Sequence, residues 1–125
     1  MSSIIKTFNT HILEFIDDVQ QVFPEDKDIR RSKTLCETIK KSNPRLLIVG
    51  WKKYVTDNYK EKIYNHDISF FIEKDYTNDV EEDQKLMNII ERLRDPVRKM
   101  GKENQQKVMK YIENLTKLSE LYDTT

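Results

Sequence analysis

The sequence predicts an all-α fold, a compact single-domain bundle of five to six helices over residues 1–125. Only 2 glycines and 3 prolines occur in the chain, which is too few turn residues for an all-β protein. Charged residues make up 35% of the sequence, a share typical of solvated helix faces. Apolar residues also recur at steps of three and four along most of the chain, which is the spacing of helices that bury one face.

The first two helices are predicted from this spacing and from their end signals. Residues 4–23 carry one apolar stripe, and Pro24 ends the helix because proline disfavours helical geometry in the residue before it. A second helix begins at a cap formed by Asp26 or Asp28 and ends at the dipeptide 43–44, Asn-Pro. Its apolar positions are few, so we expect this helix to lie mostly on the surface.

The stretch RLLIVGWKKYV, residues 45–55, could form either a buried strand that ends at Gly50 or a helix that contains this glycine. The residues after it do not alternate between apolar and polar, and no other segment offers a partner strand. Pro44 suits the first turn of a helix, and Asn43 suits the cap before it. The pattern therefore favours a helix, although Gly50 lowers helix stability by about 1 kcal/mol relative to alanine.

Three further helical segments are predicted in the rest of the chain. A short helix over residues 68–76 follows a cap at Asn65 or Asp67. A longer apolar stripe contains Pro96, so we expect that helix to kink or to restart near the residue before the proline. The final helix follows Gly101, and the similar spacing of the last two stripes predicts that these two helices pack together as a hairpin.

Few residues in the sequence carry the chemistry of an enzyme or a metal site. His11 and His66 are the only histidines, and neither belongs to a helical ligand pair. The basic neighbours of Cys36 could lower its pKa, but no base or oxyanion site accompanies it, so we interpret it as a core or boundary thiol. With two glycines, a glycine-rich phosphate loop is excluded. We therefore predict a protein that is not an enzyme and has no catalytic residue, no metal and no cofactor.

Charge is unevenly distributed, although the formal net charge is zero. Residues 26–62 hold 11 lysines and arginines against 5 acidic residues, whereas residues 63–84 hold 1 against 7. Clustered cations with interleaved aromatic rings are typical of surfaces that bind phosphates and bases, so nucleic-acid binding through residues 30–62 is one hypothesis. In the simpler alternative these cations are solvated and face the acidic stretch. The candidate polyanion contacts are Arg30, Arg31, Lys33, Lys40, Lys41, Arg45, Lys52 and Lys53.

Aromatic residues are concentrated in the middle of the chain, which favours a surface that binds another protein. Tryptophan and tyrosine are among the residues that anchor interfaces, and more rings gather here than one side of a small core needs. The alternative is that the rings fill the core of the bundle. The candidate interaction residues are Trp51, Tyr54, Tyr59, Tyr64, Phe70 and Tyr76.

Four phrases of the sequence carry a resemblance to known proteins: FPEDKDI (23–29), NPRLLIVGWKKYVTDNYKEKI (43–63), DISFFIEKDY (67–76) and KVMKYIENLTKLSELY (107–122). They resemble short uncharacterised helical proteins of giant (nucleocytoplasmic large) double-stranded DNA viruses. The resemblance implies a viral protein in the host cytoplasm, at the viral factory, or in the virion, and it brings no activity or catalytic residues.

Together these observations predict a non-catalytic protein–protein interaction module, either a virion component or an adaptor. We expect its partner to be another protein, viral or host, or a second copy of the chain, with nucleic acid as the alternative partner. The longest strictly apolar run, residues 46–49, is far too short to span a membrane, so we expect no membrane partner.

Overall fold

The computed structural model describes residues 2–69, 71 and 84–124, and within them the chain is all-α. Three of its five helices are α1 (Ser2–Val22), α2 (Lys27–Ser42) and α7 (Lys102–Thr124). The fourth is α6 (Gln84–Lys99). The fifth is a continuous helical segment that contains three labelled elements: α3 (Leu46–Trp51), the π-helical turn η1 (Lys52–Thr56) and α4 (Asp57–Tyr64). The predicted fold class is confirmed, and the described part of the chain contains no strand.

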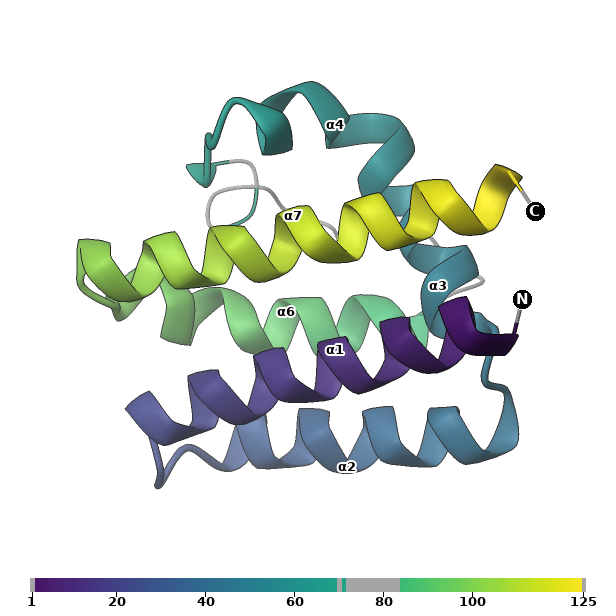
Figure 1. Cartoon of the computed structure of the whole chain (residues 1–125). Coiled ribbons are helices and arrows are strands. Elements are labelled where there is room, and N and C mark those ends of the chain that lie inside the picture. The colour runs from purple at the N-terminus through teal and green to yellow at the C-terminus, as the bar shows by residue number, and fades with distance from the viewer. Residues whose placement is uncertain (1, 70, 72–83, 125) are drawn as a thin grey trace.

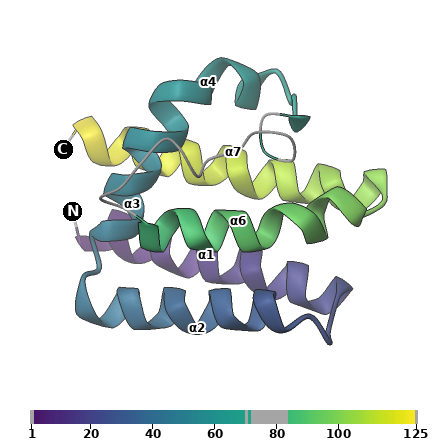
Figure 2. The ribbon, with the colours of Figure 1, turned by 180° about the vertical axis from the view of Figure 1, so that it is seen from behind.

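The helices form a compact bundle in which α1 packs on α2, α3, α6 and α7. Figure 1 shows α2, α1 and α7 side by side, with α3 and η1 rising at one end and α4 crossing the far side of α7. Figure 2 shows α6 from behind, between α2 and α7. The packing of α7 is chiefly on α1 and that of α6 is chiefly on α2. The predicted hairpin seam between the last two helices is therefore wrong, because a stripe indicates which face is buried and not which helix covers it.

The ends of α2 explain how the chain turns. The Oδ1 atom of Asp26 accepts hydrogen bonds from the backbone N–H groups of Asp28 (2.9 Å) and Ile29 (3.1 Å), so Asp26 is the cap that the sequence predicts. Asn43 ends α2, and its carbonyl oxygen accepts a bond from the N–H of Leu46 at 3.1 Å. The prediction that Asn43 caps the next helix is therefore wrong. Arg45 occupies the cap position of α3, and its side chain makes no cap hydrogen bond.

The segment 45–55 is helical, as the sequence predicts, and it enters the core. Leu47, Ile48 and Gly50 are buried in α3, and Trp51 is only 1% exposed. The edge of the Trp51 ring packs against the ring of Phe8 from α1, with the ring centroids 6.1 Å apart. This contact packs α3 against α1.

The π-helical turn η1 is a feature that the sequence does not predict. A π-helix has i→i+5 bonds in place of i→i+4 bonds, and here the N–H of Asp57 donates to the carbonyl of Lys52. The wider turn lets both Trp51 and Thr56, five residues apart, face α7, where Trp51 Nε1 donates to Thr116 Oγ1 (3.2 Å) and the Thr56 hydroxyl meets that of Ser119 (2.7 Å). Insertions of this kind bend helices, and Figure 1 shows the segment turning between α3 and α4.

The end of α4 is closed by backbone bonds around His66. Its φ of 59° lies in the left-handed region that usually favours glycine. The N–H of His66 donates to the carbonyl of Ile63 (3.0 Å), and the N–H of Asp67 donates to that of Lys62 (2.9 Å), which is the Schellman pattern of helix ends. The Asp67 carboxylate then accepts the N–H of Ser69 at 3.1 Å. Apart from residues 68, 69 and 71, the predicted helix 68–76 lies outside the described residues.

Two further features of the described helices bear on the expectations from sequence. Pro96 is buried inside a continuous α6, so the predicted restart at this proline is wrong. Proline lacks an N–H group, so the helix loses one backbone bond at this point without ending. None of the described helices combines the length and the apolar character that crossing a membrane requires.

Candidate functional site

The predicted aromatic surface is not formed as a single patch. The prediction that Trp51 belongs to an interaction surface is wrong, because its side chain lies in the core between α1 and α7. Tyr54 and Tyr59 are half-buried and pack against that core. Phe70 and Tyr76 lie outside the described residues. Of the candidate rings, only parts of Tyr54, Tyr59 and Tyr64 reach the described surface, so the alternative in which these rings fill the core accounts for Trp51.

Tyr64 belongs to a polar cluster that joins α4 to α7. Its hydroxyl donates to Glu120 Oε1 at 2.5 Å, and Lys60 Nζ lies 2.6 Å from Glu120 Oε2. Burial, followed by the bond to the carboxylate, raises the pKa of Tyr64 well above its usual value. The bond from Lys60, followed by that from Tyr64, lowers the pKa of Glu120. These contacts tie the two helices together, and they give the cluster a structural role.

Replacing Glu120 with glutamine is expected to remove a stabilisation that depends on pH. The folded-state pKa of Glu120 is lowered, so its ionised form stabilises the fold above the ordinary value of 4.5 and loses this effect as pH falls through the folded-state pKa. The difference in free energy of unfolding between wild type and Glu120→Gln should therefore be present at pH 7 and shrink below pH 4.5. Urea titrations between pH 3 and pH 7 measure this difference, and a constant value across that range would contradict the assignment.

The predicted polyanion contacts are divided between two parts of the molecule. Five of them lie on α2, Arg45 lies in the following turn, and two lie on η1, and Figure 1 shows α2 at one edge of the bundle and the η1–α4 segment at the opposite edge. Several are paired with carboxylates, since Nζ of Lys33 lies 2.8 Å from an oxygen of Asp17 and Nζ of Lys52 lies 2.7 Å from one of Asp57. The structure therefore does not bring the eight cations together on one surface.

Part of this set forms a basic face on the outside of α2. A shallow hollow of about 540 Å³ is lined by Lys27, Arg30, Arg31, Thr34, Leu35 and Thr38, all from this helix. Arg30 also donates to the carbonyl of Pro24 at 3.2 Å, and Arg31 lies 3.8 Å from Asp28. The cations are exposed, so this face can meet a phosphate without any change in the fold.

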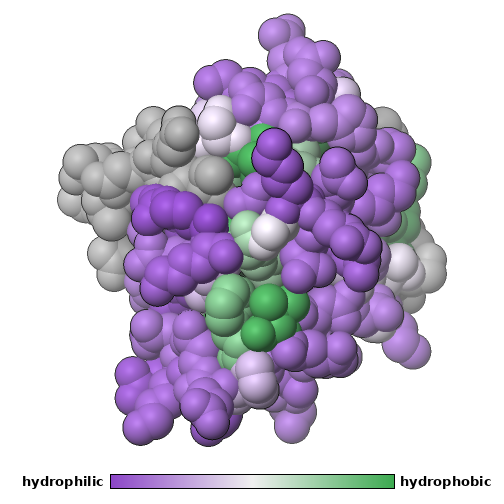
Figure 3. Space-filling view, turned by 90° about the vertical axis from the view of Figure 1, so that its left-hand side faces the viewer, coloured by the Kyte–Doolittle hydropathy of each residue, from purple (hydrophilic) through white to green (hydrophobic). Residues whose placement is uncertain are grey.

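A groove between α1 and α7, which the sequence does not predict, is a hollow of mixed polar and apolar lining in the described surface. It has a volume of about 340 Å³ and is called the α1–α7 groove below. Figure 3 shows an apolar patch at this end of the molecule, surrounded by hydrophilic surface. The lining residues are Phe15, Asp18, Val19, Gln21 and Val22 of α1, Met100 after α6, and Asn104, Lys107, Val108 and Tyr111 of α7.

Aromatic rings of the two helices stack across the floor of the α1–α7 groove. The rings of Phe15 and Tyr111 are stacked with centroids 5.5 Å apart, and the centroid of the His11 ring lies 4.9 Å from that of Tyr111. The Tyr111 hydroxyl donates to Asp18, and burial followed by this bond raises the pKa of Tyr111. Val22 also lines the groove and is 39% exposed. The groove thus combines a stacked aromatic pair and one exposed apolar side chain with polar lining residues.

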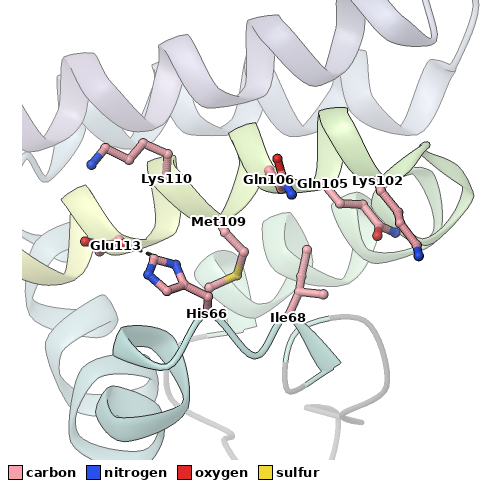
Figure 4. A pocket seen from close by; sticks show the side chains of 8 residues that line it. All are labelled: His66, Ile68, Lys102, Gln105, Gln106, Met109, Lys110 and Glu113. Atoms are coloured by element: carbon pink, nitrogen blue, oxygen red, sulfur yellow. Dashed lines mark ion pairs between the residues drawn. The ribbon is translucent and has the colours of Figure 1, made fainter.

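A second hollow lies between α7 and the turn after α4, with a volume of about 450 Å³. Figure 4 shows His66, Met109 and Ile68 in its middle, with Lys102 and Lys110 at opposite ends. The Nδ1 atom of His66 lies 3.7 Å from Glu113 Oε2. The two lysines do not converge on one point, so this hollow lacks the clustered cations of an anion site.

The remaining titratable groups do not assemble into a reactive site within the described residues. Cys36 is buried in α2, and burial raises the pKa of its thiol to about 12, which is the opposite of the lowering that its basic neighbours suggest. The thiol is therefore protonated at neutral pH and packs as a core group. In the part of the chain that the structure describes, no group of three or more histidine, cysteine or acidic side chains is placed to hold a metal ion.

Sequence reasoning missed the α1–α7 groove because each of its walls looks like an ordinary amphipathic helix. One available signal was Val22, an apolar residue at the end of the first stripe, directly before the break at Pro24. The other was the antiparallel match between residues 15–22 and residues 104–111, which only the packing of α7 on α1 reveals. The chain matches no protein-family model, no curated protein sequence and no solved structure.

Proposed function

We propose that this chain is a non-catalytic helical protein–protein interaction module and that the α1–α7 groove is its docking surface. The observation that carries the proposal is the exposed apolar side chain of Val22 at a hollow that Phe15 and Met100 also line. Apolar patches rimmed by polar residues are typical of interaction sites on soluble proteins.

The composition of the groove supports this proposal. Interface centres are depleted in charge and enriched in aromatic residues and methionine, and here Phe15, Met100 and Tyr111 line the hollow. A rigid aromatic anchor loses little conformational entropy on binding, and Tyr111 is already held by Phe15 and by Asp18. Val22 supplies the exposed apolar side chain that a partner would remove from water.

The setting of this module follows the resemblance to proteins of giant DNA viruses. On that basis we propose that the protein acts in the host cytoplasm, at the viral factory, or in the virion, as a virion component or an adaptor. Its partner is then a viral or host protein or a second copy of the chain.

The proposal is tested by changing the one exposed apolar side chain of the groove. Val22→Gln removes apolar area at the docking surface and should weaken capture of the partner by tagged protein roughly tenfold, since burying a valine contributes about 1.5 kcal/mol or more. Val49→Gln is the matched control, because Val49 is 46% exposed on α3, away from the groove. Equal loss in both variants, or no loss in either, would contradict the proposed docking surface.

A second candidate function is nucleic-acid binding, which the basic face of α2 favours. Arg30 and Arg31 line one exposed hollow, whereas Lys52 and Lys53 lie on η1 across the bundle. If nucleic acid binds this face, Arg30→Ala with Arg31→Ala should weaken binding and reduce its salt dependence, and Lys52→Ala with Lys53→Ala should have little effect. In the capture experiment, nuclease treatment would then release the bound material, whereas a direct protein partner would remain.

A further inference from the structure

From the arrangement of cations on α2 we infer that the basic face of this helix binds double-stranded nucleic acid by contacting phosphates on both sides of one groove. This inference rests on the second candidate function, because it names the form of nucleic acid that the same face takes. Lys41 extends the basic face beyond the hollow described above, since it follows Thr38 by one turn and is also exposed. The polar members of the face are then Lys27, Arg30, Arg31, Thr34, Thr38 and Lys41.

The basic face lies on the open side of α2. The other side of this helix packs on α1 and α6, and there Ile29, Cys36 and Ile39 are buried. Figure 1 and Figure 2 show α2 at one edge of the bundle, with no other described helix beyond it. In the part of the chain that the structure describes, the face is therefore open along its length.

The charge on this face has one sign. The sequence of α2 contains six lysines and arginines and two acidic residues, Asp28 and Glu37. Neither carboxylate lines the hollow, because helical spacing places both of them at its flanks. Lys27 and Lys41 make no ion pair with any residue that the structure describes. The face therefore presents cations that are available to an external phosphate.

These cations stand at the two ends of the face, with hydroxyl groups between them. Arg31 and Lys41 belong to opposite ends and are about 15 Å apart along the helix axis, at a rise of about 1.5 Å per residue. Between them, the Thr34 hydroxyl donates to the carbonyl of Arg30 (3.2 Å), and the Thr38 hydroxyl donates to that of Thr34 (3.0 Å). Both hydroxyl protons are used inside the helix, so the middle of the face has no free donor for a phosphate.

A duplex presents its phosphates in the matching pattern. The major groove of DNA is about 12 Å wide and has a row of phosphates along each side. When α2 lies across this groove, its charged ends meet the two rows, and its uncharged middle lies over the groove. A single strand has only one row of phosphates, and proteins hold its bases by stacking them on aromatic rings. Because α2 contains no aromatic residue, the face fits a duplex better than a single strand.

An anionic membrane fits the basic face less well. Helices that bind at a membrane surface bury an apolar face in the lipid. The one large apolar residue of the hollow, Leu35, is half-buried and packs against the core of the bundle. Contacts to phosphates carry no sequence information, so the binding that we infer does not depend on the base sequence.

Fluorescence anisotropy of the full-length chain tests the inference with three probes. The probes are a labelled DNA duplex of about 20 base pairs, one of its strands alone, and labelled vesicles that contain phosphatidylserine. We expect the duplex to bind on the order of tenfold more tightly than the single strand at about 0.1 M salt, and the vesicles not to bind. A preference for the single strand or for the vesicles would overturn the inference.

Removing one cation from each end of the face tests the two-sided contact. Arg31→Ala and Lys41→Ala should each weaken duplex binding roughly fivefold to tenfold at about 0.1 M salt. Each should also reduce the slope of log binding constant against log salt concentration by about 0.9, the value for one phosphate contact. A loss from only one of the two variants would contradict a helix that lies across the groove.

Matched controls separate this effect from a general effect of charge. Lys107→Ala and Lys110→Ala remove the same charge from exposed positions of α7 and should weaken duplex binding less than about twofold. Circular dichroism checks that every variant folds. Losses from the α7 variants as large as those from the α2 variants would overturn the basic face as the binding surface.

The outcomes also distinguish this inference from the proposed functions. Single-strand binding that Arg31→Ala weakens would reject the duplex and keep nucleic-acid binding by α2. No binding of either nucleic acid at about 100 µM protein would reject both, because non-specific dissociation constants are about 1–100 µM at physiological salt. Val22→Gln changes the α1–α7 groove and should leave duplex binding unchanged, so the docking surface is tested independently.

Discussion

Replacing Trp51 with alanine is expected to lower the free energy of unfolding by about 3–5 kcal/mol. The side chain is fully buried, packs on Phe8 and donates its indole N–H to Thr116, so its removal leaves a cavity and takes one hydrogen-bond donor from the Thr116 hydroxyl. Since small domains are stable by only about 5–15 kcal/mol, this one change should remove a large part of the total. Urea unfolding followed by circular dichroism measures the difference.

Two further variants show whether the loss comes from the core position. Trp51→Phe keeps most of the ring volume and should cost less than the alanine variant, while Tyr54→Ala acts on a half-buried ring and should also cost less. A loss below about 1 kcal/mol for Trp51→Ala would mean that Trp51 is not a core residue. That result would restore the original expectation that this ring belongs to an interaction surface.

Replacing Ser119 with alanine should cost about 1–3 kcal/mol, because it leaves a buried hydroxyl without its partner. The Ser119 hydroxyl donates to the carbonyl of Thr116 at 2.7 Å, so Thr56 is the donor in the 2.7 Å contact between the two hydroxyls. Ser119→Ala alone leaves the Thr56 hydroxyl without its acceptor. Adding Thr56→Val removes that unpaired hydroxyl. The double variant should therefore lose less free energy of unfolding than the sum of the two single variants.

The same unfolding experiment supplies the control. Ser42→Ala removes an exposed hydroxyl that bonds to the carbonyl of Thr38, and we expect it to change stability by less than about 0.5 kcal/mol. Strictly additive losses for Thr56→Val and Ser119→Ala would mean that the two hydroxyls do not form a coupled contact. In that case η1 would not be explained by the polar groups that it directs toward α7.

The sequence predicts most helices of this fold because local signals determine them. The stripes give α1, α2, α6 and α7, and Asp26 marks a helix start because its carboxylate bonds to nearby N–H groups. The choice of helix over strand for residues 45–55 is confirmed for the same reason, since a strand would have needed a distant partner. Where the signal depends only on residues three or four positions away, the sequence is sufficient.

What the sequence does not predict depends on contacts between distant segments. The π-helical turn satisfies Trp51 and Thr56 through side chains more than sixty residues away, so no local pattern encodes it. The end of α4 uses His66 in a conformation that usually favours glycine, so the common signal is missing. The apolar stripe of α6 packs on α2, and that of α7 packs on α1. The spacing within each stripe does not indicate which helix covers it.

The predicted sites also depend on contacts between distant segments, which the sequence does not show. Aromatic residues counted along the chain suggested a surface, but Trp51 points inward once α3 packs on α1. Cations counted along the chain suggest one basic patch, but five of them lie on α2 and two lie on η1, which packs on α7. The α1–α7 groove arises only where residues near 18 and near 107 meet, which composition and spacing do not show.

The most direct test of the α1–α7 groove as a docking surface is site-specific photo-cross-linking in cells that express the full chain. A photoreactive side chain is placed at position 22 in one sample and at position 49 in another, because both positions are exposed and only the first lies at the groove. We expect a discrete protein adduct, either with a second copy or with another protein, from position 22 and not from position 49. An adduct from position 49 alone, or none from either position, would contradict the central claim.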